Sequence, residues 1–370
     1  MTQLAEPTQT TKSRYVATRA PLLTRVKAGL TTPGGLIWVL LIALIIAIFL
    51  YNPQLGEPGQ FLRFLARMAP IAIVAIGQYF VLVSGEFDLS MGAVIGVQVV
   101  LAGTLISEDP ARIVPTVLLM FGIAVLVGLI NGLVTTLLRV PGFITSLGMM
   151  LLLSGLAFYS TGGSAGQNPV DEFRVVGRGG FEAPLIGYIP WAVVVLAAVI
   201  PLAVWLTRRP FGRLLLLSGA NAEVARLTGT RVWWLQTRAY IISACAATVA
   251  AILLVGFAGV HPSVGNGYEF TAITACVLGG VVLGGGRGWL LSVVAGAFVL
   301  ESLFTLLNFV GIEATWRPTV QGAIIIIAMI AAGPKFFHWK RPAKRGGPST
   351  DLAPKTPDSG DETSSLPSAN

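Results

Sequence analysis

Residues 208–231 read RRPFGRLLLLSGANAEVARLTGTR, and this basic stretch separates two strongly apolar segments, residues 191–206 and 239–260. A charged loop between two long apolar segments is expected at a membrane surface. Short loops that collect Lys and Arg mark the cytoplasmic side of a membrane. We therefore expect the stretch to face the cytoplasm, because it carries Arg208, Arg209, Arg213, Arg226 and Arg231.

The whole chain has the composition of an integral membrane protein. Of its 370 residues, 54% are hydrophobic and only 11% are charged, and the mean hydropathy is +0.77; a soluble domain is about one quarter charged. The net charge of +8 does not indicate a nucleic-acid partner, because the basic residues lie at the ends of apolar segments, where they set topology. The two cysteines and two histidines are isolated, so we expect no disulfide, metal or cofactor.

Apolar segments of nearly the ~20 residues that a bilayer requires recur between residues 33 and 333. We expect an all-α, polytopic membrane bundle of about ten transmembrane helices. Basic residues at the start, middle and end of the chain agree with an even number of spans and two cytoplasmic termini. Residues 1–32 and 334–370 are then cytoplasmic tails, the second disordered from its composition, and residues 208–232 form a cytoplasmic loop within the membrane domain.

Local signals in the basic stretch predict a short helix. Asn221 is a good N-cap, Glu223 falls in the first turn, where a negative charge suits the helix dipole, and Gly229 is suited to end the helix in a left-handed conformation. A short helix between two spans is well placed to fit a groove on a soluble partner. The alternative is an ordinary connecting helix.

Two carboxylates stand between apolar segments in the stretch SGEFDLSMG, residues 84–92. Charged groups at membrane depth are costly and mark function, so Glu86 and Asp88 are candidate functional residues. Gly85 and Gly92 would let the backbone break and approach its neighbours closely. The alternative is a plain cytoplasmic turn, and the pattern alone does not decide between the two.

Small and polar residues inside the spans predict close helix packing. Gly92 and Gly96, and also Gly128 and Gly132, have the four-residue spacing that brings helix backbones together. Asn131 is a polar side chain at depth, and a bond to a neighbouring helix is favoured over contact with a substrate.

Three further segments carry polar or charged residues between or within the apolar runs. Residues 161–190 are the longest internal hydrophilic stretch, which would be outside the membrane and would contact a binding protein or serve as a connector. The stretch GGGRG at residues 284–288 lacks the Lys and Ser/Thr of a phosphate-binding loop and is expected to be a turn after an eighth span at about residues 271–283. Glu301 is another candidate intramembrane carboxylate.

Several motifs, in order, make the chain resemble the ribose/xylose/arabinose-type sugar permeases of bacterial ABC importers. The family form Gly-Gly-Ile-Asp-Leu-Ser-Val-Gly is matched at Gly85, Asp88, Leu89, Ser90 and Gly92. The other matches are Asn131-Gly132 with Arg139-Val140-Pro141-x-Phe143-Ile144 and Leu147-Gly148, Phe211-Gly212-Arg213 with Gly219-x-Asn221-x-x-x-Ala225-x-x-x-Gly229, and Gly265-x-Gly267-Tyr268-Glu269. The chain departs at Glu86, where the common form has Gly and the xylose-type branch has an acid, and at Ser146 in place of Thr. The resemblance covers residues 61–329.

This resemblance implies a permease subunit of the bacterial inner membrane that is not itself an enzyme. Its partners would be a separate ATPase subunit, an extracytoplasmic sugar-binding protein and a second permease subunit, and its substrate a monosaccharide, with a pentose such as xylose or ribose favoured. The ATPase-docking residues would be Gly219, Asn221, Glu223, Ala225 and Gly229. The residues of the translocation path or signature would be Gly85, Glu86, Asp88, Ser90, Gly92 and Asn131.

Two alternatives remain at this stage. One is a permease for branched-chain amino acids or nucleosides, whose chains look similar. The other is a self-contained secondary transporter that uses Glu86, Asp88 and Glu301 as proton or ion sites. Such a transporter would work alone under an ion gradient, whereas an ABC importer requires ATP and an ATPase partner.

Overall fold

The computed structural model describes residues 33–184 and 187–336. The chain divides into two units, residues 1–328 and 329–370, and the architecture below is that of the first. The tail expected at residues 1–32 and most of that at 334–370 lie outside the described residues; residues 334–336 end the last described helix.

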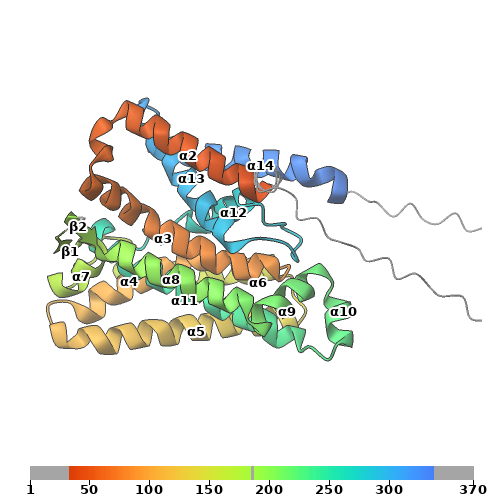
Figure 1. Cartoon of the computed structure of the whole chain (residues 1–370). Coiled ribbons are helices and arrows are strands. Elements are labelled where there is room, and N and C mark those ends of the chain that lie inside the picture. The colour runs from red at the N-terminus through yellow and green to blue at the C-terminus, as the bar shows by residue number, and fades with distance from the viewer. Residues whose placement is uncertain (1–32, 185–186, 337–370) are drawn as a thin grey trace, which may run out of the picture. The chain divides into compact units, whose positions relative to one another are not determined.

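The described residues are mostly helical (Figure 1). The longer helices are α2 Pro33–Tyr51, α3 Pro58–Val83, α4 Met91–Ile106, α5 Ile113–Leu137, α6 Gly142–Thr161, α8 Trp191–Arg208, α11 Val232–Ala258, α12 Tyr268–Leu278, α13 Leu290–Phe309 and α14 Arg317–Phe336. The shorter elements are η1 Pro53–Gly56, η2 Pro110–Arg112, α7 Asp171–Arg178, β1 Gly180–Ala183, β2 Gly187–Pro190, α9 Pro210–Ala220, α10 Ala222–Leu227 and η3 Ala314–Trp316.

Six of the described helices are long and apolar enough to cross a bilayer: α3, α5, α6, α8, α11 and α13. The expectation of about ten spans and of two cytoplasmic termini therefore stays a prediction. One expected span differs clearly, because α12 has only 11 residues and ends at Leu278. At 1.5 Å per residue it is about 16 Å long, roughly half of a bilayer core, and the residues up to Trp289 are not helical.

Helix α11 is the centre of the bundle and packs against α5, α3 and α4. Two glycines of α5 allow the closest of these approaches. A Cβ atom placed on Gly128 would lie 2.5 Å from the Cα of Ile241, and one on Gly132 would lie 2.5 Å from the Cα of Thr237. The predicted close packing at this pair of glycines is confirmed.

The glycines of α4 pack closely as well, but against a segment of turns instead of a helix. A Cβ atom on Gly96 would lie 2.5 Å from the carbonyl oxygen of Pro262, and one on Gly103 would lie 2.8 Å from the side chain of Val260. Residues 259–267 therefore run along α4 and are partly buried there, whereas the sequence predicts an outer loop at residues 260–270. Glycine spacing indicates close approach but does not identify the partner.

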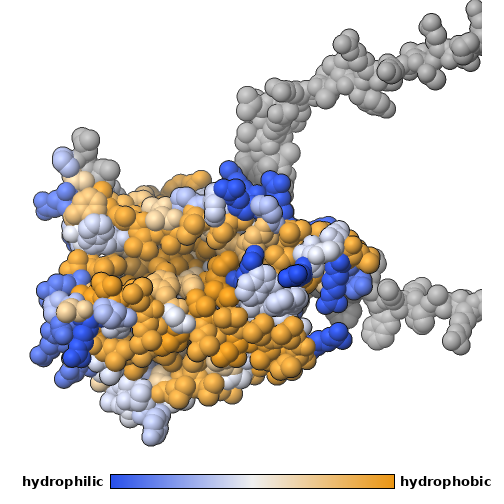
Figure 2. Space-filling model, turned by 90° about the horizontal axis from the view of Figure 1, so that it is seen from below, coloured by the Kyte–Doolittle hydropathy of each residue, from blue (hydrophilic) through white to orange (hydrophobic). Residues whose placement is uncertain are grey.

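Apolar side chains cover much of the outer surface of the bundle. Leu118, Leu151 and Leu202 have exposed fractions of 68%, 64% and 56%, whereas α3 is buried throughout from Met68 to Val83. Figure 2 shows a broad hydrophobic surface with hydrophilic residues gathered at two of its ends. Large contiguous apolar surface of this kind is suited to lipid and unsuited to water.

The hydrophilic segment at residues 161–190 has its own structure. It contains helix α7, which packs on α11 and α8, and an antiparallel hairpin in which Gly180 pairs with Pro190 and Ala183 with Gly187. This two-stranded sheet is a small departure from the all-helical expectation. It occupies one end of the long helices and α9–α10 the other (Figure 1); α8 joins the two ends and, with 18 residues, spans about 27 Å.

Candidate functional site

Asp88 is the centre of a buried polar network between α3 and α4. Its side chain is 1% exposed. One carboxylate oxygen accepts bonds from the backbone N–H of Ser90 at 2.9 Å and from the Ser90 hydroxyl at 2.6 Å, and the other accepts a bond from the Ser243 hydroxyl at 2.6 Å. The residues between α3 and α4 are therefore tied to the central helix α11 by a charge-assisted bond.

Asn131 joins the same network from α5. Its amide nitrogen donates to the Ser90 hydroxyl at 2.9 Å, so the prediction that it bonds a neighbouring element is confirmed. Its amide oxygen is buried and has no partner among the described residues. A buried acceptor of this kind is costly, and it leaves one hydrogen-bonding group available inside the network.

Glu86 lies two residues before Asp88 in the same loop and makes a separate set of contacts. Its carboxylate accepts bonds from the backbone N–H of Gly142 at 3.2 Å, at the start of α6, and from the side chain of Gln236 at 3.4 Å. The adjacent carbonyl of Phe87 accepts a bond from the Tyr240 hydroxyl at 3.0 Å. Both carboxylates thus hold the loop against its neighbours, and neither is freely exposed as in a plain surface turn.

Burial and hydrogen bonding act in opposite directions on these carboxylates, which lie in a loop outside the helices. Burial raises the pKa of Asp88, while the bonds from Ser243 and Ser90 lower it. Burial also raises the pKa of Glu86, and the bond from Gly142 lowers it. Desolvation is the larger effect in both cases, so each carboxylate depends on its donors to remain charged.

Three of the residues that hold this loop were not singled out from the sequence. Gln236, Tyr240 and Ser243 come from α11 and are spaced four and three residues apart, so that they share one face of the helix. A row of polar side chains at helical spacing within an apolar span was the available signal. Its partners, however, lie about 150 residues away along the chain.

Glycines from three distant segments meet beside the same loop. Gly85 has a φ of +90° and Gly285 a φ of +84°, a conformation that glycine adopts without strain. A Cβ atom on Gly285 would lie 2.7 Å from the nitrogen of Gly85 and 3.0 Å from the oxygen of Gly219. We call the contact of Gly85, Gly219, Gly285 and Gly286 the glycine junction. It confirms that the stretch at 284–288 is a turn and shows why the turn needs glycine.

A backbone hydrogen bond closes the glycine junction. The N–H of Gly286 donates to the carbonyl of Val83, the last residue of α3, at 2.9 Å. A side chain on Gly219 would overlap that carbonyl oxygen and lie 2.7 Å from the nitrogen of Gly286. The end of α9 is therefore in backbone contact with the end of α3, next to the Asp88 loop.

The basic stretch forms two helices, α9 and α10, where the sequence predicted one. The predicted cap is confirmed, because the side chain of Asn221 accepts bonds from the backbone N–H groups of Glu223 at 3.0 Å and Val224 at 3.1 Å. Gly229, with a φ of +78°, follows the helix in the expected left-handed conformation. Helix α9 was missed, since its leucine-rich sequence, residues 210–220, was taken as part of a loop.

The predicted docking residues do not form one surface. Ala225 is fully buried and Gly219 belongs to the glycine junction, so both support the position of α10 from behind. The outer face of α10 instead presents Val224 at 45% exposure and Leu227 at 80%, flanked by an ion pair between Glu223 and Arg226 at 3.6 Å. Two exposed apolar side chains on a polar helix are the features that suit a partner groove.

We expect Asn221→Ala to destabilise α10 by about 1 kcal/mol, the usual cost of losing an N-cap side chain. Hydrogen exchange at the amides of residues 223–228 would measure this, and exchange should become faster there while α9 is unaffected. Asn221→Asp is the matched control, because a carboxylate caps equally well. Unchanged exchange in the alanine variant would contradict the capping role.

Gly92 lies outside the Asp88 network. A Cβ atom there would overlap the carboxylate of Glu269 and lie 2.5 Å from the carbonyl oxygen of Gly265. Its predicted place in the translocation path is not tested by these contacts. What they show is that the start of α4 and the start of α12 touch at a point where only glycine fits.

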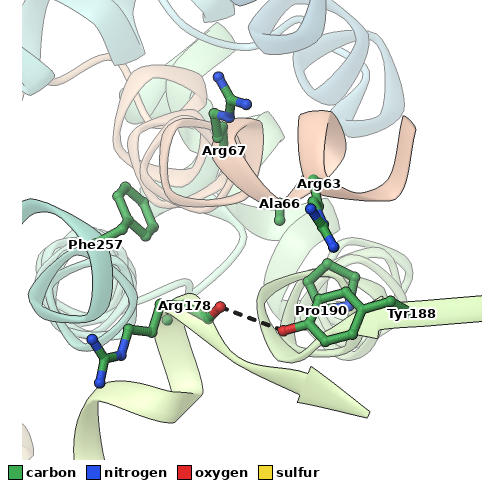
Figure 3. Close-up of a pocket in the computed structure, with 8 residues that line it drawn as sticks. Arg63, Ala66, Arg67, Arg178, Tyr188, Pro190 and Phe257 are labelled. Atoms are coloured by element: carbon green, nitrogen blue, oxygen red, sulfur yellow. Dashed lines mark hydrogen bonds between the residues drawn. The ribbon is translucent and has the colours of Figure 1, made fainter. Parts of the chain in front are cut away.

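A cavity lies beside the hairpin, at the opposite end of the bundle from α10 (Figure 1), and Figure 3 shows its lining residues. It has a volume of about 550 Å³ and is lined by three arginines, Arg63, Arg67 and Arg178, together with Tyr188 of the hairpin. The guanidinium of Arg63 lies over the ring of Tyr188 at 5.2 Å. A cation–π contact therefore joins α3 to the hairpin, while the guanidinium of Arg178 forms an ion pair with Asp171.

The apolar surface, the buried polar network and the exposed helix at one end define a multi-pass membrane protein of the permease class. The model of the family described as "Branched-chain amino acid transport system / permease component" matches residues 60–329. The chain therefore belongs to this family of ABC importer permeases of the bacterial inner membrane, which confirms the resemblance seen in the sequence.

Curated relatives agree with this assignment. The ribose import permease protein RbsC of Bacillus subtilis (strain 168) is 31% identical over 78% of this chain and 89% of its own. The autoinducer 2 import system permease protein LsrC of Escherichia coli (strain SMS-3-5 / SECEC) is 30% identical over 71% and 76%. The galactose/methyl galactoside import permease protein MglC of Escherichia coli (strain K12) is 29% identical over 83% and 96%. No solved structure matches the chain.

Proposed function

We propose that this chain is the subunit that carries a monosaccharide across the inner membrane in an ABC importer, with a pentose favoured. The names of its relatives support a sugar, since they import ribose, galactose and autoinducer 2. The preference for a five-carbon sugar comes from the sequence motifs, since the identities to the ribose and galactose permeases, 31% and 29%, are nearly equal. The chain would pair with a second permease subunit around a shared path.

The energy would come from a separate ATPase subunit docked on α10. The observation that carries this is the arrangement at one end of the bundle: α10 exposes Val224 and Leu227, while the adjoining α9 ends in the glycine junction. A push on α10 would pass through backbone contacts, without flexible side chains between, to the loop that holds Asp88. The loop that holds Asp88, with its hydrogen-bond network, would then have two alternative positions, and ATPase binding would shift the equilibrium between them.

The external binding protein would dock at the other end. The exposed arginines Arg63 and Arg67 of α3 suit an acidic partner, because complementary charge speeds and orients association. The hairpin and α7 give the hydrophilic segment at residues 161–190 a defined shape for such a contact.

We expect Leu227→Arg to weaken ATPase docking and to lower ATP-dependent sugar uptake by about tenfold or more, since losing a buried apolar contact and burying a charge costs more than 1.4 kcal/mol. Co-purification with the ATPase and uptake in proteoliposomes would measure both. Because Leu227 is 80% exposed, folding should be unaffected. Val310→Arg is the matched control, because Val310 is also an exposed apolar residue, at 60%, and lies far from α10 at the end of α13.

Three outcomes would argue against the proposal. Wild-type docking and uptake in Leu227→Arg would exclude α10 as the contact. Uptake by the purified chain alone under an ion gradient would favour a secondary carrier. ATP-dependent uptake of leucine or isoleucine, with none of ribose, xylose or galactose, would favour the amino-acid substrate in the family description.

A further inference from the structure

A second cavity, at the turn between α2 and α3, contains a buried carboxylate that the proposed function does not use. The cavity has a volume of about 490 Å³, within the range of ~300–1,000 Å³ usual for small-molecule sites. Its polar lining comes from η1, α3, α13 and the start of α14, and includes Asn52, Gln60, Arg67, Glu301, Asn308 and Arg317. Helix α13 packs against both α2 and α3 (Figure 1), which encloses the site.

The two central groups of this cavity are close but incompletely paired. Glu301 and Arg317 are 3.8 Å apart, which is too long for a direct hydrogen bond. The second carboxylate oxygen of Glu301 and the Nε of Arg317 are buried and have no partner among the described residues. The side chain of Glu301 is only 14% exposed. Buried polar groups are normally satisfied, so this pair has acceptor and donor capacity left for a bound molecule.

The ligand that satisfies such a pair must both donate and accept. A hydroxyl group can donate to the Glu301 carboxylate while it accepts from the Arg317 guanidinium. A simple anion would face the negative charge of Glu301, and a simple cation would face Arg67 and Arg317. Phe64 and Phe309 add aromatic surface to the lining, on which the apolar face of a sugar ring would pack.

We propose that this cavity is an acceptor site for a neutral polyol, in which sugar hydroxyls bridge Glu301 and Arg317. The inference rests on the proposed function, because it takes the sugar as the transported substrate. Part of the lining comes from residues 52–55 and 308–317, which connect expected spans and which the alternation of spans from a cytoplasmic start would place on the outer side of the membrane. The site would therefore receive sugar after release from the binding protein and before it enters the path.

Equilibrium binding of labelled ribose and galactose to the purified chain in nanodiscs, without ATPase or binding protein, would test the site. We expect saturable binding that weakens about tenfold or more in Glu301→Ala, since the sugar hydroxyl would lose its charged hydrogen-bond acceptor. Glu301→Gln should weaken binding less. Glu313→Gln is the matched control, because Glu313 is exposed and does not line the cavity.

Deoxy sugars separate recognition from a structural role. A deoxy sugar that lacks the bridging hydroxyl should bind the wild type more weakly than the parent sugar, and this difference should vanish in Glu301→Ala. If Glu301→Ala fails to fold, Gln60→Ala gives a second reading, since Gln60 is exposed and lines the cavity; it should weaken binding by about threefold, as expected for one hydrogen bond.

Several results would overturn the proposal. These are no saturable sugar binding above empty nanodiscs, equal affinity in the wild type and Glu301→Ala, and occupation by inorganic phosphate or anionic lipid in preference to sugar. If ATP-dependent uptake with the ATPase and binding protein persists under any of these outcomes, only the acceptor site is wrong. If uptake itself is absent, the proposed function fails separately.

Discussion

Replacing Asp88 with alanine is expected to lower sugar uptake by about tenfold or more and to lower the thermal unfolding midpoint. The carboxylate accepts three hydrogen bonds inside the protein, from the Ser90 backbone, the Ser90 hydroxyl and the Ser243 hydroxyl. Removing it leaves three buried donors without their acceptor, at about 1–3 kcal/mol each when no other partner is found. The loop between α3 and α4 would lose its tie to α11.

Thermal unfolding in detergent and ATP-dependent uptake in proteoliposomes would measure the two effects. Asp88→Asn is the informative companion, because its amide retains one acceptor and nearly the same volume. It should keep most of the stability, so that any uptake defect that remains reports on the charge. Glu108→Ala, which removes an exposed carboxylate, is the control; equal unfolding midpoints for it and Asp88→Ala would show that the network contributes nothing.

Sequence patterns were sufficient for features that depend on neighbouring residues. Asn221 and Gly229 could be placed at the two ends of a helix because caps act over three or four residues. Similarly, the glycine-rich stretch at 284–288 could be recognised as a turn. Runs of apolar residues located the long helices, since the bilayer sets their length.

Features that depend on tertiary packing could not be predicted from the sequence. Helix α12 begins at Tyr268 and ends at Leu278, whereas the expected span ran from about residue 271 to residue 283. The turns at residues 259–267, which lie along α4, are set by contacts with α4 that the local sequence does not show. The partners of Asp88 were also missed, as Ser243 lies 155 residues away.

The docking prediction stays a prediction, but the structure shows how the residues of its motif are placed. The pattern from Gly219 to Gly229 marks α9–α10, but two of its members, Gly219 and Ala225, face into the fold. Small residues in a motif indicate close contact without saying whether the neighbour is another subunit or the same chain. The exposed face, Val224 and Leu227, carries no glycine or alanine and was not singled out.

Replacing Gly219 with valine is expected to lower sugar uptake while ATPase binding and ATP hydrolysis persist. The new side chain would overlap the Val83 carbonyl and push against Gly286, so it would break the 2.9 Å bond between those two residues. Overpacking of this kind usually costs about 1–3 kcal/mol, and more where backbone atoms are struck. Because α10 lies beyond the glycine junction and keeps its exposed face, ATPase docking should survive.

The expected result is therefore an assembly that still binds its ATPase and hydrolyses ATP, but whose sugar uptake is reduced by about tenfold or more. Co-purification, ATP hydrolysis and uptake, measured on the same preparation, would show the separation. Gly148→Ala is the matched control, because a Cβ atom there meets nothing within 4 Å and alanine favours a helix. Wild-type uptake in Gly219→Val would mean that motion from α10 reaches the Asp88 loop by another route, whereas loss of ATPase binding would place the glycine junction in docking and not in transmission.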